Sequence, residues 1–167
     1  FKESVIELKN ALKSDPAHTQ SRILLGKLYF AAGKMEDAVK ELRKARKLNA
    51  PREDWLLVLA RVYFGQGKYD DLLTETADLS GLSANIKSLI LSLNGQVYTK
   101  KGDFEQAKQS LNQALLSDAG NDSAIIGLAT IEVIEGNIES AEESVSEVLT
   151  RSGKNIQALE FMLKLKL

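Results

Sequence analysis

The sequence predicts an all-α solenoid of about ten helices, paired in antiparallel hairpins. Four glycines, at positions 33, 67, 102 and 136, recur at spacings of 34, 35 and 34 residues, and each opens a similar string such as GKMEDAVKEL or GDFEQAKQSL. A fixed period of this length is typical of stacked helical hairpins. The chain has only two prolines, so long helices can run uninterrupted. No window alternates apolar and polar residues long enough to predict a sheet.

The elements follow one another as partial and full copies of one repeat. Residues 1–16 match the second half of a copy. Full copies are expected at 19–52, 53–87, 88–121 and 122–155, and residues 156–167 match the start of another. Solenoids need terminal repeats with a polar outer face, and neither end of this sequence reads as one. We therefore expect a single solenoid that is a fragment of a longer array.

Within each copy, a small residue on the first helix lets the second helix approach closely, and larger residues three or four positions away fill the space beside it. The small residues are Gly26, Ala60, Gly95 and Ala129. The four periodic glycines stand where the first helix must stop and reverse, which favours a positive φ.

The residue after each periodic glycine can cap the second helix. Asp103 is the best candidate, with Gln106 three positions later, and Asn137 is a good one. Lys34 and Lys68 are poor caps.

The second copy departs from the pattern. Leu72, Thr76 and Leu79 stand where two alanines and a large residue are expected, and Ser80–Ser83 follow. We expect a shorter or shifted helix here, a longer connection, and a kink in the superhelix.

The repeat resembles the tetratricopeptide repeat. In the first full copy Arg22, Leu25, Gly26 and Tyr29 stand at the family's first-helix positions, and Ala38, Leu42 and Ala45 match its second helix. The other copies match in register, so the resemblance covers essentially the whole chain. It implies a right-handed α-α superhelix that acts as a non-catalytic scaffold and binds a protein or peptide in its concave groove.

In this family the first helix of each hairpin lines the groove. Carrying those positions over gives a candidate partner-binding set: Ile23, Lys27, Phe30, Leu57, Arg61, Phe64, Gln96 and Lys100. Aromatic and Arg side chains are frequent anchors of interfaces. Packing of Phe30 and Phe64 on the neighbouring repeat is an equally good interpretation of those two residues.

Several longer runs, among them SRILLGKLYFAAGKMEDAVKELRKARKL and GQVYTKKGDFEQAKQSLNQAL, are similar to bacterial tetratricopeptide lipoproteins that accompany exosortase/PEP-CTERM sorting and exopolysaccharide systems. That resemblance implies an exported protein of the periplasm or envelope that scaffolds polymer export or protein sorting. Without it, a cytoplasmic location is the default.

The sequence offers no chemistry for an enzyme. The one histidine, His18, is expected in a surface turn, and no Cys–His cluster for zinc or phosphate-binding loop is present. We therefore expect no catalytic residues, metal or cofactor, and no segment is apolar enough to span a membrane.

Charge is unevenly distributed although the total is −1. Residues 1–50 hold 11 Lys/Arg and 6 Asp/Glu, whereas residues 103–150 hold one Lys and 10 Asp/Glu. The acidic half disfavours nucleic acid as a partner. A solvated helix face explains the basic run at 40–47, and electrostatic steering or head-to-tail self-association is the alternative. A self-assembly element that stacks through exposed solenoid ends is thus the rival to a groove-binding scaffold.

Overall fold

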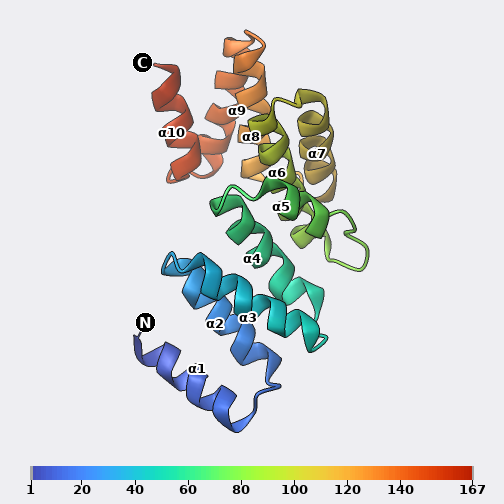
Figure 1. The fold of residues 1–167 in the computed structure, drawn as a ribbon. Helices are drawn as coiled ribbons and strands as arrows, with labels where there is room; N and C mark the ends of the chain where they lie inside the picture. Colours follow the sequence, from blue (N-terminus) through green and yellow to red (C-terminus); the bar gives the residue numbers. More distant parts are fainter. Residues whose placement is uncertain (1, 167) are drawn as a thin grey trace. The chain divides into compact units, whose positions relative to one another are not determined.

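The computed structural model describes residues 2–166, which form ten α-helices and no strand (Figure 1). The expected all-α fold is confirmed. The chain divides into two compact units, Phe1–Leu82 and Ser83–Leu167, and each is described by itself.

The first unit holds five helices, in which each contacts the next along the chain. They are α1 (Lys2–Ser14), α2 (Thr19–Ala31), α3 (Met35–Lys47), α4 (Arg52–Gly65) and α5 (Tyr69–Glu75). Leu42, Leu56 and Leu59 are fully buried. A Cβ placed on Gly26 would lie 2.8 Å from Cγ of Leu42, so the small residue on α2 does permit the close approach of α3.

The second unit repeats this arrangement with five more helices, and here α8 also contacts both α6 and α10. The helices are α6 (Ala84–Lys101), α7 (Phe104–Ser117), α8 (Asp122–Ile134), α9 (Ile138–Arg151) and α10 (Ile156–Leu165). One core cluster centres on Leu111 between α6, α7 and α8, and a second gathers Ala141, Val145 and Val148 of α9 against α8 and α10. The contacts of α8 with α6 and α10 place three first helices side by side.

The periodic glycines end the first helices as expected. Their φ angles are 71° at Gly33, 69° at Gly67, 77° at Gly102 and 89° at Gly136. In this left-handed region a side chain would clash with its own backbone. The predicted turn positions are therefore confirmed.

The helix caps agree with the sequence only in part. Asp103 accepts a hydrogen bond from the backbone N–H of Gln106 at 3.2 Å, as predicted. Asn137 makes no side-chain cap bond, so that prediction is wrong; its ψ of 57° falls short of the extended backbone at Asn121 (92°) and Asn155 (106°), both of which do cap. His18, expected as a plain surface residue, is exposed and caps α2 through Nδ1.

The second copy shows the expected irregularity. Helix α5 has only seven residues, and α6 begins at Ala84 after a connection that contains the boundary between the two units. Thr76 Oγ1 donates a hydrogen bond back to the carbonyl of Leu72 at 2.9 Å. A hydroxyl bonded in this way competes with the continuing helix. The shorter helix and longer connection are confirmed, and the kink stays a prediction.

Candidate functional site

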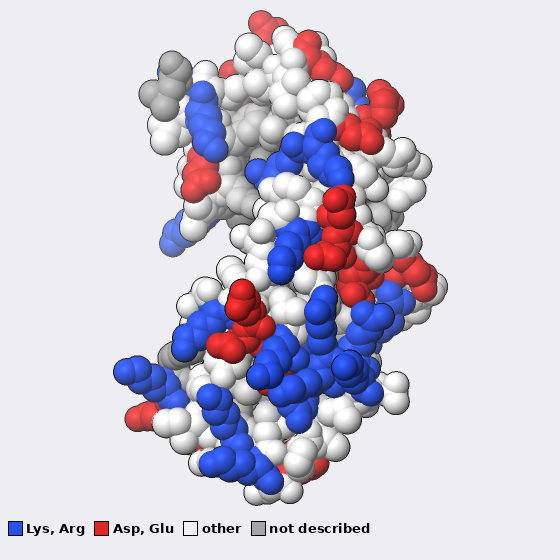
Figure 2. Space-filling view, in the orientation of Figure 1, with Lys and Arg blue, Asp and Glu red and all other residues white. Residues whose placement is uncertain are grey.

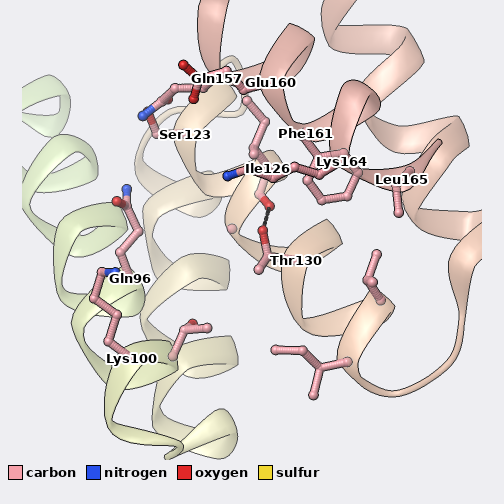
Figure 3. Close-up of a pocket in the computed structure, with 14 residues that line it drawn as sticks. Gln96, Lys100, Ser123, Ile126, Thr130, Gln157, Glu160, Phe161, Lys164 and Leu165 are labelled. Carbon is pink, nitrogen blue, oxygen red and sulfur yellow. Dashed lines mark hydrogen bonds between the residues drawn. The ribbon is translucent and has the colours of Figure 1, made fainter. Parts of the chain in front are cut away.

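The second unit contains a hollow of about 490 Å³ between its three first helices (Figure 3). Gln96, Thr99 and Lys100 of α6 form one wall. Residues of α8 form the floor, and residues of α10 form the opposite wall. The volume lies within the usual range for binding sites of small molecules and short segments.

Helical periodicity explains which side chains reach the hollow. On α8 they include Ser123, Ile126, Thr130 and Val133, spaced three or four residues apart and hence on one helix face. Helix α10 presents Gln157, Glu160, Phe161 and Lys164, which also share one helix face. Four of the lining positions on α10 lie 34 residues after lining positions on α8, so the repeat itself generates the site.

The lining combines an apolar surface with a few polar groups. Apolar side chains include Ile126, Val133, Phe161 and Leu165. Lys100 and Lys164 come from opposite walls, and Glu160 stands on the same helix as Lys164 (Figure 3). Such a surface can bury apolar groups of a partner while a few polar contacts fix its orientation.

Hydrogen bonds tie successive first helices together at equivalent repeat positions. Ser123 Oγ donates to Oε1 of Gln157 at 3.1 Å, linking α8 to α10. Gln20 Nε2 donates to Oδ2 of Asp54 at 3.1 Å, linking α2 to α4 in the first unit. Each pair spans 34 residues, and each holds one edge of the surface that the first helices present.

Two of the eight predicted binding residues, Gln96 and Lys100, line the hollow. The other six lie in the first unit. There Lys27 and Arg61 are exposed, and Phe30 and Phe64 are partly buried. The Phe64 ring lies 5.9 Å from that of Tyr69, centroid to centroid.

Ile23 and Leu57 require a correction. Ile23 is fully buried and Leu57 is 9% exposed. Their apolar side chains pack into the core, because the groove-facing position carried over from the family lies next to the interhelical seam.

Sequence reasoning missed the whole α10 wall, namely Gln157, Glu160, Phe161 and Lys164. Carrying the fourth-copy groove positions Ser123, Ile126 and Thr130 forward by 34 residues gives Gln157, Glu160 and Lys164. It does not give Phe161, which corresponds to Gly127. Gly127 of α8, which also lines the hollow, was missed because it stands next to a packing position.

The described helices include none long and apolar enough to cross a membrane. Among residues 2–166, no group of three or more His, Cys, Asp or Glu side chains is placed to hold a metal ion.

Comparison with family models gives two matches. Residues 3–75 match the model for anaphase-promoting complex, cyclosome, subunit 3, and residues 93–121 match a model of the tetratricopeptide repeat. No curated protein matches the chain.

Solved structures of similar fold cover nearly all of the chain. PilF from Pseudomonas aeruginosa aligns with a TM-score of 0.79 and 19% identity over 96% of this chain and 72% of that one. TTC0263, a thermophilic TPR protein of Thermus thermophilus, gives 0.76 and 19% over 98% and 89%. YrrB, described as a TPR protein with an unusual peptide-binding site, gives 0.70 and 16% over 95% and 81%.

At these identities the solved structures establish the fold alone. They share the all-helical solenoid architecture, and the two family-model matches fall within the repeats, over residues 3–75 and 93–121. Taken together, the repeat motifs, the fold and these matches support the assignment of this chain as a tetratricopeptide-repeat protein.

Proposed function

We propose that the chain is a non-catalytic protein-interaction scaffold and that it binds a peptide or protein segment in the hollow between α6, α8 and α10. The observation that carries the proposal is the origin of the hollow: equivalent positions of three successive first helices converge on it. A peptide-binding site is also part of the description of YrrB, a protein of the same fold.

The lining favours a segment with apolar side chains and at least one acidic group. Ile126, Val133 and Phe161 offer contact area, and burying apolar surface is the main source of binding energy. Lys164 and Lys100 can attract a carboxylate, and Glu160 disfavours a second one nearby.

Selection from a displayed peptide library against the immobilised chain tests this proposal. Selected peptides should bind the double variant Phe161→Ala, Lys164→Glu at least about tenfold more weakly, since truncating an aromatic anchor typically costs about 2 kcal/mol or more. Leu116→Ala is the matched control, because Leu116 is 88% exposed on α7 and does not line the hollow. Circular dichroism must show that each variant is folded.

The same peptides also test the first-unit face. The variant Phe30→Ala, Arg61→Ala, Phe64→Ala should bind them like the unaltered chain. If this variant loses binding and the Phe161 variant keeps it, the site lies in the first unit, together with Lys27, and the hollow is rejected.

We also propose a setting for the scaffold, a bacterial envelope system for exopolysaccharide export or protein sorting. Its support is the resemblance of the longer runs, including SRILLGKLYFAAGKMEDAVKELRKARKL, to lipoproteins of such systems. Fractionation of cells that produce the complete gene product tests it. Recovery in the cytoplasmic fraction would reject the envelope setting and leave the interaction function intact.

The rival function is self-assembly through the ends of the solenoid. One observation favours it: Ile156, Leu159 and Leu163 form an apolar row on α10, and they are 70%, 48% and 60% exposed. Association through such a row should persist or strengthen in sulfate salts. Analytical ultracentrifugation of Leu159→Lys, Leu163→Lys against the unaltered chain measures its contribution.

A further inference from the structure

Helix α3 carries a row of basic side chains on its outer face. Lys40, Arg43, Lys44 and Lys47 are spaced three or four residues apart, so they share one face of the helix. Figure 2 shows Lys and Arg side chains gathered over α3. The row extends over about 10 Å at the helical rise of about 1.5 Å per residue. We call it the basic face of α3.

Contacts inside the first unit use only part of this charge. Lys44 pairs with Glu41 at 2.8 Å, and Arg43 donates to the hydroxyl of Tyr63 at 2.9 Å, which is a neutral acceptor. Lys40 and Lys47 are exposed and have no acidic partner among the described residues. Like charges three or four residues apart weaken a helix. The C-terminal end of α3 favours Lys44 and Lys47 in its last turn, but it does not account for Lys40.

Helix α9 carries a complementary row. Glu139, Glu142, Glu143 and Glu147 are all exposed, and none forms an ion pair within residues 2–166. They too recur at three- and four-residue intervals, over about 12 Å of helix. This acidic face of α9 therefore matches the basic face of α3 in length, spacing and number of charges, with opposite sign.

We propose that the basic face of α3 docks against the acidic face of α9 in a second copy of this chain. Each copy carries both faces, so the contact is heterologous and can repeat from copy to copy. The chain as a whole has a net charge of −1. The attraction between copies therefore comes from the two charged faces, because identical copies have the same net charge.

Sedimentation velocity of the unaltered chain, over a range of protein concentrations and at two salt concentrations, measures this association. The Debye length is about 30 Å at 0.01 M salt and about 3 Å at 1 M. We expect the average mass to rise above 18.4 kDa with protein concentration at low salt and to return to it at high salt. This salt dependence distinguishes the charged contact from stacking through the apolar row of α10.

Charge reversal locates the contact. The variant Lys40→Glu, Lys47→Glu and the variant Glu139→Lys, Glu143→Lys should each associate at least about tenfold more weakly, because like charges then face each other. A mixture of the two should associate again, since the reversed α3 of one meets the reversed α9 of the other. Lys2→Glu, Lys13→Glu on α1 is the matched control and should associate like the unaltered chain.

Several outcomes would overturn the proposal. They are a constant mass of 18.4 kDa at every protein concentration in low salt, reversal variants that associate unchanged, and a mixture that fails to recover. Loss of association on reversing α3 but not α9 would assign the basic face to a different acidic partner.

If a charge-reversed chain does not fold, neutral variants give the same comparison. They are Lys40→Gln, Lys47→Gln on α3 and Glu139→Gln, Glu143→Gln on α9. The hollow takes no part in this test, so a failed selection of peptides leaves its result unaffected.

Discussion

Leu111 fills the space that Gly95 leaves open: a Cβ on Gly95 would lie 2.5 Å from Cγ of Leu111. The same leucine also reaches α8, because a Cβ on Gly127 would lie 2.8 Å from its Cδ2. One fully buried side chain on α7 thus sets the distance to both neighbouring first helices. Those two helices form a wall and the floor of the hollow, so the packing of Leu111 determines the geometry of the site.

Gly95→Ala should therefore destabilise the second unit. Overpacking a tight core typically costs about 1–3 kcal/mol, and the gain in helix propensity of up to about 1 kcal/mol offsets only part of it. Urea unfolding measures the change. Gly65→Ala on α4 is the control, since its Cβ would meet only the flexible tip of Met35, at 3.3 Å. Equal stability losses in the two variants would contradict this account of the packing.

The fold was predictable from the sequence because each copy of the repeat carries its own turn and packing residues. The turn glycines and the small residues between paired helices follow from a pattern that recurs in each copy. The short α5 follows from the failure of that pattern in the second copy. Caps were less predictable. Whether Asn121 or Asn137 bonds the following backbone depends on a difference between ψ angles of 92° and 57°, and residue type does not encode such a difference.

The candidate site was only partly predictable for a related reason. Gln96 and Lys100 were found by position within the repeat, whereas Ile23 proved to be core. A groove position and a seam position are neighbours on a helix, so a small rotation of the helix exchanges burial for exposure. Periodicity fixes the face of a helix to within about one residue and no better.

Asn121→Ala should destabilise the second unit by about 1–3 kcal/mol, because it removes a cap and a hydrogen bond between two buried side chains. The Oδ1 atom of Asn121 caps α8 through the N–H of Ala124, and its Nδ2 donates to Ser88 Oγ at 2.7 Å. Ser88 Oγ in turn donates to the carbonyl of Ala114.

Thermal unfolding compares this variant with Asn137→Ala, which removes an asparagine at the same kind of position but no side-chain cap bond. The Asn137 variant should stay within about ±0.5 kcal/mol of the unaltered chain. Similar losses in the two variants would show that the cap and the Ser88 contact contribute little.

Asp78 should make the connection between α5 and α6 sensitive to acid. The backbone N–H and then the hydroxyl of Ser80 donate hydrogen bonds to its carboxylate, and Arg52 adds a favourable charge, so the pKa of Asp78 lies below its ordinary value of 3.8. The unfolded chain then binds the proton more readily than the folded chain. The stabilisation is fully present above pH 3.8 and is lost as pH falls through the lowered folded pKa.

Titration of the Asp78 carboxyl by NMR gives the folded pKa directly, and a midpoint at or above 3.8 would refute this assignment. Asp78→Asn is the companion variant. This variant lacks the carboxylate, so its free energy of unfolding should lose the part of the pH dependence that Asp78 contributes.

Glu132→Tyr should stabilise the second unit. Glu132 stands where the first three full copies have Tyr29, Tyr63 and Tyr98, and its Oε2 is buried without a hydrogen-bond partner among the described residues. A buried acceptor left unpaired is costly, and restoring a repeat's usual residue commonly adds about 0.5–2 kcal/mol. Glu132 also attracts Lys108, but that lysine keeps its closer partner Glu135 at 2.6 Å.

Differential scanning calorimetry should show a higher midpoint for Glu132→Tyr and no comparable rise for the exposed control Glu139→Tyr. A lower midpoint would mean that the site has no room for the ring and that the carboxylate fits its surroundings better than the hydrogen bonds indicate.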